Sequence, residues 1–326
     1  MFENFVLEIV ETERGPIRLR HGGSGPPLLL IHGHPRSHMT WGRVAELLSG
    51  DFRVVCPDLP GFGRSYQRVD DPSSRFSSKR EKSFALVDLM ERLGHHAFFV
   101  AGHDRGSLVA FRMEMDHPAV VRKLIVVDGL PVIEHLERTD WQFAYDWFHW
   151  FFFAQPEKPE RAIMADPMAW YNTLRPELMG REAYDELVSL IHDPDVIHGM
   201  VEDYRVGIRI DHHHDREDRG AGRKVRCPML CLWSLDDDLE QIYGDPVEIW
   251  RRWRRTYAAT ESKAGTTSPK TLLSQRPSEL SIISPESYRI HSGDTGNEFS
   301  RTPFAEVKLK RNWDERTTTG QRCRLR

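Results

Sequence analysis

The stretch "VAGHDRGSLVA", residues 100–110, has the pattern of a strand that turns sharply into a helix. An apolar run leads into Gly102, an acid follows at Asp104, and Gly106 comes before an amphipathic stretch. Glycines on both sides of a central residue allow the tight turn that exposes a nucleophile at the end of a strand. The alternative is an ordinary helix N-cap aspartate, which needs no catalytic role. The stretch therefore predicts a nucleophile turn whose central residue is a carboxylate.

The sequence on either side predicts further strands that alternate with helical segments. Apolar runs end in glycine, proline or acids at residues 26–35, 52–65, 121–131 and 227–238, and helical spacing covers 83–94 and 107–118. This alternation predicts an α/β fold with a doubly wound, mostly parallel sheet. Sites in such sheets lie beyond the carboxyl ends of the strands. These ends carry His32, Asp58, Asp104, Asp128 and Asp237.

We expect the core to be formed by residues 1–131 and 218–255, and an inserted helical cap by residues 132–217. The cap segment is rich in aromatic residues, as in "WQFAYDWFHWFFFAQP". From residue 256 to 326 the chain becomes rich in serine and threonine and loses its apolar periodicity. This composition is more typical of a disordered segment than of a final strand and helix.

Composition excludes several classes of function. The net charge is −4, which does not favour nucleic acid as a partner. No apolar run approaches the roughly 18 residues of a membrane helix, and the N-terminus lacks a signal-peptide layout. Cys227 and Cys231 flank a predicted buried strand, which favours a core role over a metal site or a disulfide. We therefore expect a cytoplasmic protein without cofactor or metal that acts on a small molecule and water.

Several motifs in order resemble the haloacetate (fluoroacetate) dehalogenase and epoxide hydrolase-like branch of the α/β-hydrolase superfamily. The resemblance covers about residues 3–253. It is carried by "LLIHGHPRSHMTW", "VVCPDLPGFGRS", "VAGHDRGSLVAFRMEMDHP", "VVDGLP", "FHWFFFAQP" and "VEDYR".

The resemblance implies a nucleophile and its supporting groups. Asp104 would attack a saturated carbon and form an ester, which suits a group that needs no deprotonation at neutral pH. The turn at His34 would supply backbone N–H groups as an oxyanion hole, and Arg105 would clamp a substrate carboxylate. Asp128 would orient a catalytic histidine, with Asp237 as the alternative acid. The halide would be received by the cap residues His149, Trp150 and Tyr204, for which plain packing is the competing interpretation.

One departure from the family leaves the substrate open. The fluoroacetate enzymes carry a second arginine three residues after the first, where this chain has Leu108. With one arginine fewer to bind a carboxylate, the candidate substrates include a haloalkane or an epoxide as well as a small haloacid. Arg36 is a candidate to compensate for the missing arginine.

The family's catalytic histidine has no clear counterpart. The last histidine of the chain, His291, lies in "YRIHSGD" without a convincing strand before it, and is a weak candidate. Residues 265–274 can be back-translated into DNA with codons that the genetic code allows. When this DNA is read in the frame that starts at the third base of each codon, it can encode Gly-His-His-Ile-Ala-Glu-Asp-Ala-Pro-Glu, which resembles the closing motif of the family. We therefore hypothesise that the reading frame slips near residues 253–256, so that residues 256–326 are a frameshift product. Continuous DNA whose codons do not permit this shifted reading would contradict the hypothesis.

Three interpretations of function follow. The first is a dehalogenase-like hydrolase whose turnover is impaired for lack of the histidine. The second is an epoxide hydrolase-like enzyme that uses cap tyrosines as acids, and the third is a binding protein that keeps the pocket without catalysis. The motif "DHHHD" (211–215) is interpreted as a solvated surface turn rather than a metal site. The oligomeric state stays open, with a homodimer as one option.

Overall fold

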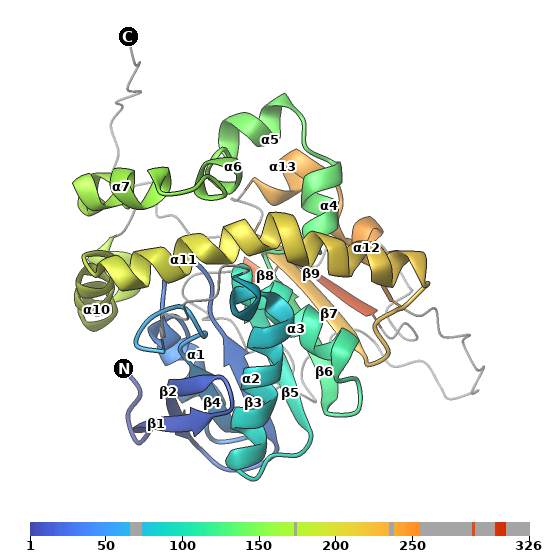
Figure 1. Ribbon diagram of the computed structural model, residues 1–326. Coiled ribbons are helices and arrows are strands. Elements are labelled where there is room, and N and C mark those ends of the chain that lie inside the picture. The colour runs from blue at the N-terminus through green and yellow to red at the C-terminus, as the bar shows by residue number, and fades with distance from the viewer. Residues whose placement is uncertain (66–73, 173–174, 235–237, 255–288, 291–303, 311–326) are drawn as a thin grey trace.

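A nine-stranded sheet forms the centre of the molecule (Figure 1). The computed structural model describes residues 1–65, 74–172, 175–234 and 238–254, together with the strands at 289–290 and 304–310. The strand order is β1-β2-β4-β3-β5-β6-β7-β9-β8, with antiparallel pairs at both ends and parallel pairs between β4 and β9. The strands are β1 (Val6–Thr12), β2 (Gly15–Gly22), β3 (Pro27–Ile31), β4 (Arg53–Pro57), β5 (Phe98–His103), β6 (Val121–Val127), β7 (Met229–Ser234), β8 (Arg289–Ile290) and β9 (Phe304–Lys310).

Helices connect the parallel strands, which confirms the predicted α/β class. The central strands are nearly continuous apolar runs because parallel strands are buried on both faces. Short 3₁₀ turns lie at His38–Trp41 and Arg75–Ser77. The helices around the sheet are α1 (Gly42–Leu48), α2 (Lys79–Arg92), α3 (Arg105–Asp116), α13 (Leu239–Tyr243) and α14 (Pro246–Arg251).

Between β6 and β7 the chain forms a series of helices, of which α11 runs across the molecule in Figure 1. A π-helix, Gly207–Asp211, joins α11 directly to α12. None of the helices that the structure describes is long and apolar enough to span a bilayer. The inserted helices are α4 (Val132–Glu137), α5 (Trp141–Asp146), α6 (His149–Phe153), α7 (Lys158–Ala165), α8 (Pro167–Trp170), α9 (Pro176–Met179), α10 (Arg181–Ile191), α11 (Pro194–Val206) and α12 (His212–Gly220).

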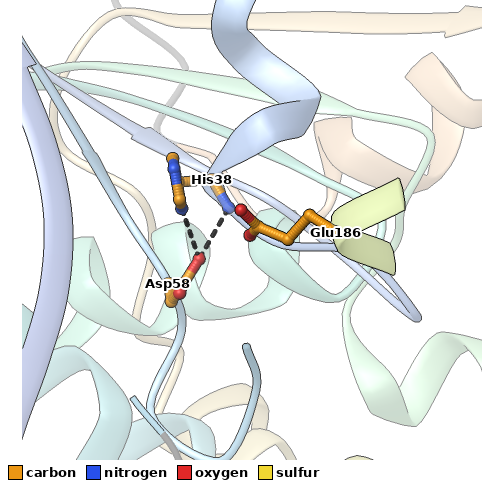
Figure 2. Close-up of side chains that lie close together, drawn as sticks. All are labelled: His38, Asp58 and Glu186. Carbon is orange, nitrogen blue, oxygen red and sulfur yellow. Dashed lines mark hydrogen bonds and ion pairs between the residues drawn. The ribbon is translucent and has the colours of Figure 1, made fainter. Parts of the chain in front are cut away.

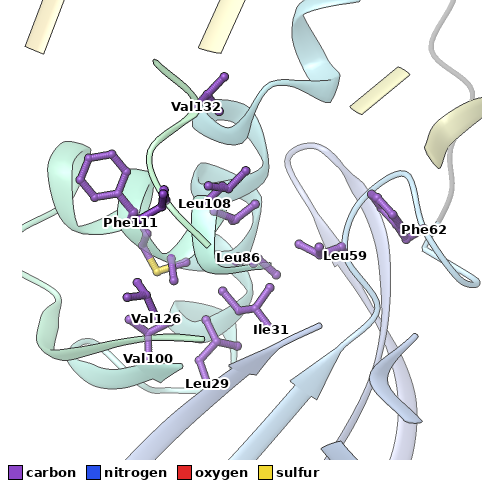
Figure 3. Close-up of a cluster of buried hydrophobic side chains, with 14 of the residues drawn as sticks. Leu29, Ile31, Leu59, Phe62, Leu86, Val100, Leu108, Phe111, Val126 and Val132 are labelled. Atoms are coloured by element: carbon purple, nitrogen blue, oxygen red, sulfur yellow. The ribbon is translucent and has the colours of Figure 1, made fainter. Parts of the chain in front are cut away.

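The main hydrophobic core lies between the sheet and helices α2 and α3. Figure 3 shows Ile31, Val100 and Val126 of three neighbouring strands close to Leu86 of α2 and Leu108 of α3. Each of these side chains is almost fully withdrawn from water, and burying one large aliphatic side chain contributes about 1.5–3 kcal/mol. Leu108 is 3% exposed, so the position at which the resemblance implies a second arginine is here part of the core.

The segment after residue 255 contributes two strands that the sequence did not predict. β9 pairs in parallel with β7, from Met229 opposite Phe304 to Ser234 opposite Leu309, and β8 pairs with β9. The physical reason is local, because "FAEVKLK" alternates apolar and charged residues with the period of a strand. The proposed shift of the reading frame concerns mostly residues outside the described part of the chain and stays a prediction.

Candidate active site

Asp104 lies at the sharp turn between β5 and α3, with φ 52° and ψ −121°. Residues other than glycine rarely adopt such a backbone conformation, which costs on the order of 1–3 kcal/mol and is found mostly at functional sites. The two glycines make the turn feasible. A Cβ on Gly102 would lie 2.2 Å from the carbonyl oxygen of Gly106, and one on Gly106 would lie 2.4 Å from the carbonyl oxygen of His32. The sequence pattern around Asp104 thus forms the predicted turn for steric reasons.

The carboxylate of Asp104 points at the loop that follows β3. The backbone N–H of His34 donates a hydrogen bond of 2.7 Å to Asp104 Oδ1. A Cβ on Gly33 would lie 2.2 Å from the same oxygen, so the loop can approach only because residue 33 has no side chain. Burial raises the pKa of Asp104, and the positive charges of His103 and Arg105 oppose this shift. The site therefore holds a desolvated carboxylate beside a backbone donor.

Aromatic side chains from α6 and α11 surround His34. The ring of Tyr204 lies 5.4 Å from that of His34, 5.6 Å from that of His149 and 5.7 Å from that of Trp150, measured between centroids. Burial, followed by the charge of Arg105, lowers the pKa of His149 to about 4, so its imidazole is neutral at pH 7 and keeps one N–H donor. The structure therefore brings together the three residues predicted as a halide cradle.

Arg105 is 1% exposed and already has a carboxylate partner. Its Nε donates to Asp203 Oδ2 at 2.6 Å and its Nη2 donates to the carbonyl oxygen of Asp203 at 3.1 Å. The guanidinium lies 4.1 Å from the ring centre of Tyr204 and 4.7 Å from that of Trp150. Its Nη1 is buried without a hydrogen-bond partner among the described residues. Sequence reasoning missed Asp203, although it precedes Tyr204 in "VEDYR" and its acidic side chain was the available signal.

Asp128 follows β6 with φ 51° and faces the end of β7. Its Oδ1 accepts a hydrogen bond of 2.8 Å from the backbone N–H of Ser234, and Nε2 of His103 lies 3.6 Å from its Oδ2. Among the described residues, His103 is the histidine that faces this acid. The other two predicted candidates, Asp237 and His291, lie outside the described residues.

A second group of charges, His38, Asp58 and Glu186, supports the loop that carries His34 (Figure 2). The backbone N–H and Nδ1 of His38 donate to Asp58 Oδ1 at 2.8 and 2.7 Å. Burial would raise the pKa of Asp58, but the hydrogen bonds and charge of His38 outweigh it and lower the pKa to about 2. Histidine, aspartate and glutamate are common metal ligands. Here, however, Arg18 lies 3.5 Å from Asp58 and 3.2 Å from Glu186 and supplies the positive charge. The group therefore holds the loop in place.

The motif "DHHHD" is helical rather than a turn, and only part of it is solvated, since the side chain of His213 is 63% exposed. It ends the π-helix and begins α12, and both of its acids are buried. Asp211 forms an ion pair of 3.2 Å with Lys79, and Asp215 forms one of 2.9 Å with Arg112. The physical reason is helical spacing, because Asp211 and Asp215 are four residues apart and point to the same side, toward α2 and α3.

The fold and the site place the chain among known proteins. Residues 26–205 match the family model described as the alpha/beta hydrolase fold. A fluoroacetate dehalogenase of Burkholderia sp is 38% identical over 238 residues, which are 71% of this chain and 78% of that protein. The human protein named epoxide hydrolase 4 is 30% identical over 254 residues, or 72% of this chain and 66% of its own length.

Solved structures agree with this assignment. A proposed alpha/beta hydrolase of Nostoc sp PCC 7120 superposes with a TM-score of 0.75 at 37% identity, over 78% of this chain and 89% of that chain. A proposed epoxide hydrolase of Pseudomonas aeruginosa has a TM-score of 0.70 at 36% identity, over 77% and 85% of the two chains. The chain belongs to the alpha/beta hydrolase fold family.

Proposed function

We propose that the chain displaces halide from a small haloacid, with Asp104 as the nucleophile. One carboxylate oxygen of Asp104 forms a bond to the carbon that carries the halogen, the carbon–halogen bond breaks, and the halide leaves with the bonding electron pair. The product is an ester of Asp104. The observation that carries the proposal is the sharp turn, in which Asp104 lies beside Arg105 and the backbone N–H of His34. The similarity to a fluoroacetate dehalogenase supports it.

The leaving halide needs hydrogen-bond donors in a dry environment. His149, Trp150 and Tyr204 offer two N–H groups and one O–H, and Trp150 and Tyr204 are 4% and 2% exposed. Burial raises the pKa of Tyr204, so the phenol keeps its proton at neutral pH. Charge-assisted hydrogen bonds to an anion are stronger than neutral ones, and they strengthen as the negative charge develops on the halogen. These donors would therefore favour the displacement itself.

Release of the product requires hydrolysis of the ester. A base removes a proton from water, the water oxygen attacks Cγ of Asp104, and the alcohol oxygen of the hydroxy acid leaves. The N–H of His34 would then stabilise the negative charge on the carbonyl oxygen. In this proposal Asp128 orients a histidine, and the predicted candidate His291 lies outside the described residues. We propose that the first step is fast and that release is slow.

Epoxide opening is the second candidate function. Two buried tyrosines, Tyr171 and Tyr204, flank His34, and the hydroxyl of Tyr171 lies 3.3 Å from His34 Nε2. Burial raises the pKa of both phenols, which leaves each able to donate a proton or a hydrogen bond to an epoxide oxygen. Relatives named epoxide hydrolases support this alternative.

The products distinguish the two functions. The purified chain is incubated separately with chloroacetate and with a terminal epoxide, and chloride and diol are measured over the first turnover and beyond. We expect chloride release of one equivalent per chain followed by a slower phase, with little diol. Diol formation without chloride release would assign the site to epoxides. The absence of both products would contradict both functions.

Gly33 provides a test of the position of the carboxylate. In Gly33→Ala, the new methyl group occupies space taken by Asp104 Oδ1 and pushes the carboxylate away from the substrate carbon. We expect the rate of chloride release in the first turnover to fall by about 100-fold, because a displacement of roughly 1 Å has such an effect on reacting groups. Gly50→Ala is the matched control, since a Cβ there meets nothing within 4 Å. A Gly33→Ala rate within twofold of the parent would show that Asp104 is not the reacting group.

A further inference from the structure

Five buried charged groups from four elements meet around Asp203. Nζ of Lys79 lies 3.0 Å from Asp203 Oδ2 and 3.2 Å from Asp211 Oδ2, and Nζ of Lys82 contacts Asp203 Oδ1. Arg105 completes the group through its 2.6 Å contact with Asp203 Oδ2. The five side chains are each at most 4% exposed, so water screens them little. We call them the Asp203 cluster.

The Asp203 cluster carries an excess of positive charge. Three cations face two carboxylates, so the group bears a net charge of about +1 when all five are ionised. With Arg105 as its sole partner, Asp203 would cancel the charge of that arginine. The contacts from Lys79 and Lys82 mean that Asp203 is shared among three cations, and Arg105 is not neutralised.

Arg105 and Lys79 both lie close to the backbone of Gly207, the residue that follows α11. A Cβ on Gly207 would lie 3.2 Å from Arg105 Nη2 and 3.6 Å from Lys79 Nζ, so the missing side chain leaves room for both groups. Lys82 lies on α2 with its ammonium 4.7 Å from the ring centre of Phe62. Backbone and side chains from distant parts of the sequence thus build the cluster beside the nucleophile turn.

Asp203 already takes part of the donor capacity of Arg105. Asp203 uses Nε and Nη2 of Arg105, which leaves the buried Nη1 as the donor without a partner among the described residues. Leu108 lies in the core and offers no charge. The charge of the cluster can favour anionic substrates without touching them, because field effects act over several ångströms in a buried site.

We propose that Lys82, together with Lys79, determines the preference of the site for anionic over neutral α-halo substrates by leaving a net positive charge beside Asp104. The proposal rests on the proposed function, since it assumes displacement at Asp104. Lys82 acts here as a specificity-determining residue that does not touch the substrate.

The test compares an acid with its uncharged analogue. Chloroacetate and chloroacetamide are each reacted with the full chain at pH 7, and formation of the Asp104 ester is followed by peptide mapping of quenched samples. Mapping to Asp104 excludes alkylation of cysteines from the measurement. Burial lowers the pKa of Lys82 to about 8, so the ammonium is mostly charged under these conditions. The readout is the ratio of the two second-order rate constants, which is insensitive to the fraction of folded protein.

We expect the acid-to-amide ratio to fall by about tenfold in Lys82→Met, because one buried positive charge is removed. Lys82→Arg keeps the charge and should retain the ratio. Asp211→Asn removes a negative charge from the same cluster and should raise the ratio, a result that structural damage would not produce. If Lys82→Met does not fold, Asp211→Asn decides the matter alone.

Two outcomes would overturn the proposal. A ratio unchanged within twofold in Lys82→Met, or one that fails to rise in Asp211→Asn, would contradict the role of the cluster while leaving displacement at Asp104 intact. No ester on Asp104 of the parent chain with either reagent would contradict the proposed function itself, and the inference with it.

Discussion

Replacing Asp104 by asparagine should abolish the displacement of halide. An amide oxygen is a far weaker nucleophile than a carboxylate, and no other group can take its place at the tip of the turn. We expect the rate of chloride release from chloroacetate to fall by at least about 1,000-fold, as for other residues that form the covalent intermediate. The measurement is chloride release in the first turnover, with intact-mass spectrometry of the same samples.

The asparagine variant should keep the structure of the turn. Its side-chain oxygen can still accept the hydrogen bond from His34, and the backbone at residue 104 is unchanged. Asp185→Asn, on an exposed ion pair with Arg181, serves as the matched control and should react like the parent. A folded Asp104→Asn variant that releases chloride at the parent rate would show that another residue attacks the carbon.

Replacing Asp203 by asparagine should destabilise the protein more than any other single change in the site. The carboxylate contacts Lys79, Lys82 and Arg105, whose side chains are only 1–2% exposed. Breaking a buried ion pair from one side leaves uncompensated charge in a poorly hydrated interior and costs about 3–5 kcal/mol. This is a large part of the roughly 5–15 kcal/mol that keeps a domain folded.

Denaturant unfolding measures this effect directly. We expect the midpoint for Asp203→Asn to shift strongly toward lower denaturant, without a matching shift in Asp185→Asn, where water surrounds both partners. Burial would raise the pKa of Asp203, but Arg105 and the lysines hold it well below its usual range. A midpoint equal to that of the parent would show that the three cations do not depend on Asp203.

The sequence predicted those parts of the fold and site that depend on local patterns. Gly102, Asp104 and Gly106 are close in the chain, and their spacing alone indicates the turn. The family resemblance, carried by short motifs, pointed to the cap residues His149, Trp150 and Tyr204. Alternating strands and helices predicted the parallel sheet for the same reason, since each element shows its own period.

The sequence could not predict contacts between charges that are far apart in the chain. Lys82 and Asp203 are 121 residues apart, and the local sequence around each of them is that of a charge exposed to solvent. Asp211 was likewise assigned to a surface turn, because three histidines beside it mask the helical spacing of the acids. Burial of a charge depends on which partner the fold brings to it, and a single segment does not contain that information.

Isolation of the covalent intermediate shows directly whether Asp104 attacks the carbon that carries the halogen. The parent chain is mixed with chloroacetate, quenched in acid at successive times and digested, and the modified peptide is identified while chloride is measured in parallel. We expect one carboxymethyl group per chain, attached through an ester to Asp104, which appears together with the first equivalent of chloride. Chloride released while Asp104 stays unmodified at every time, or a carboxymethyl group on another residue instead, would contradict displacement by Asp104.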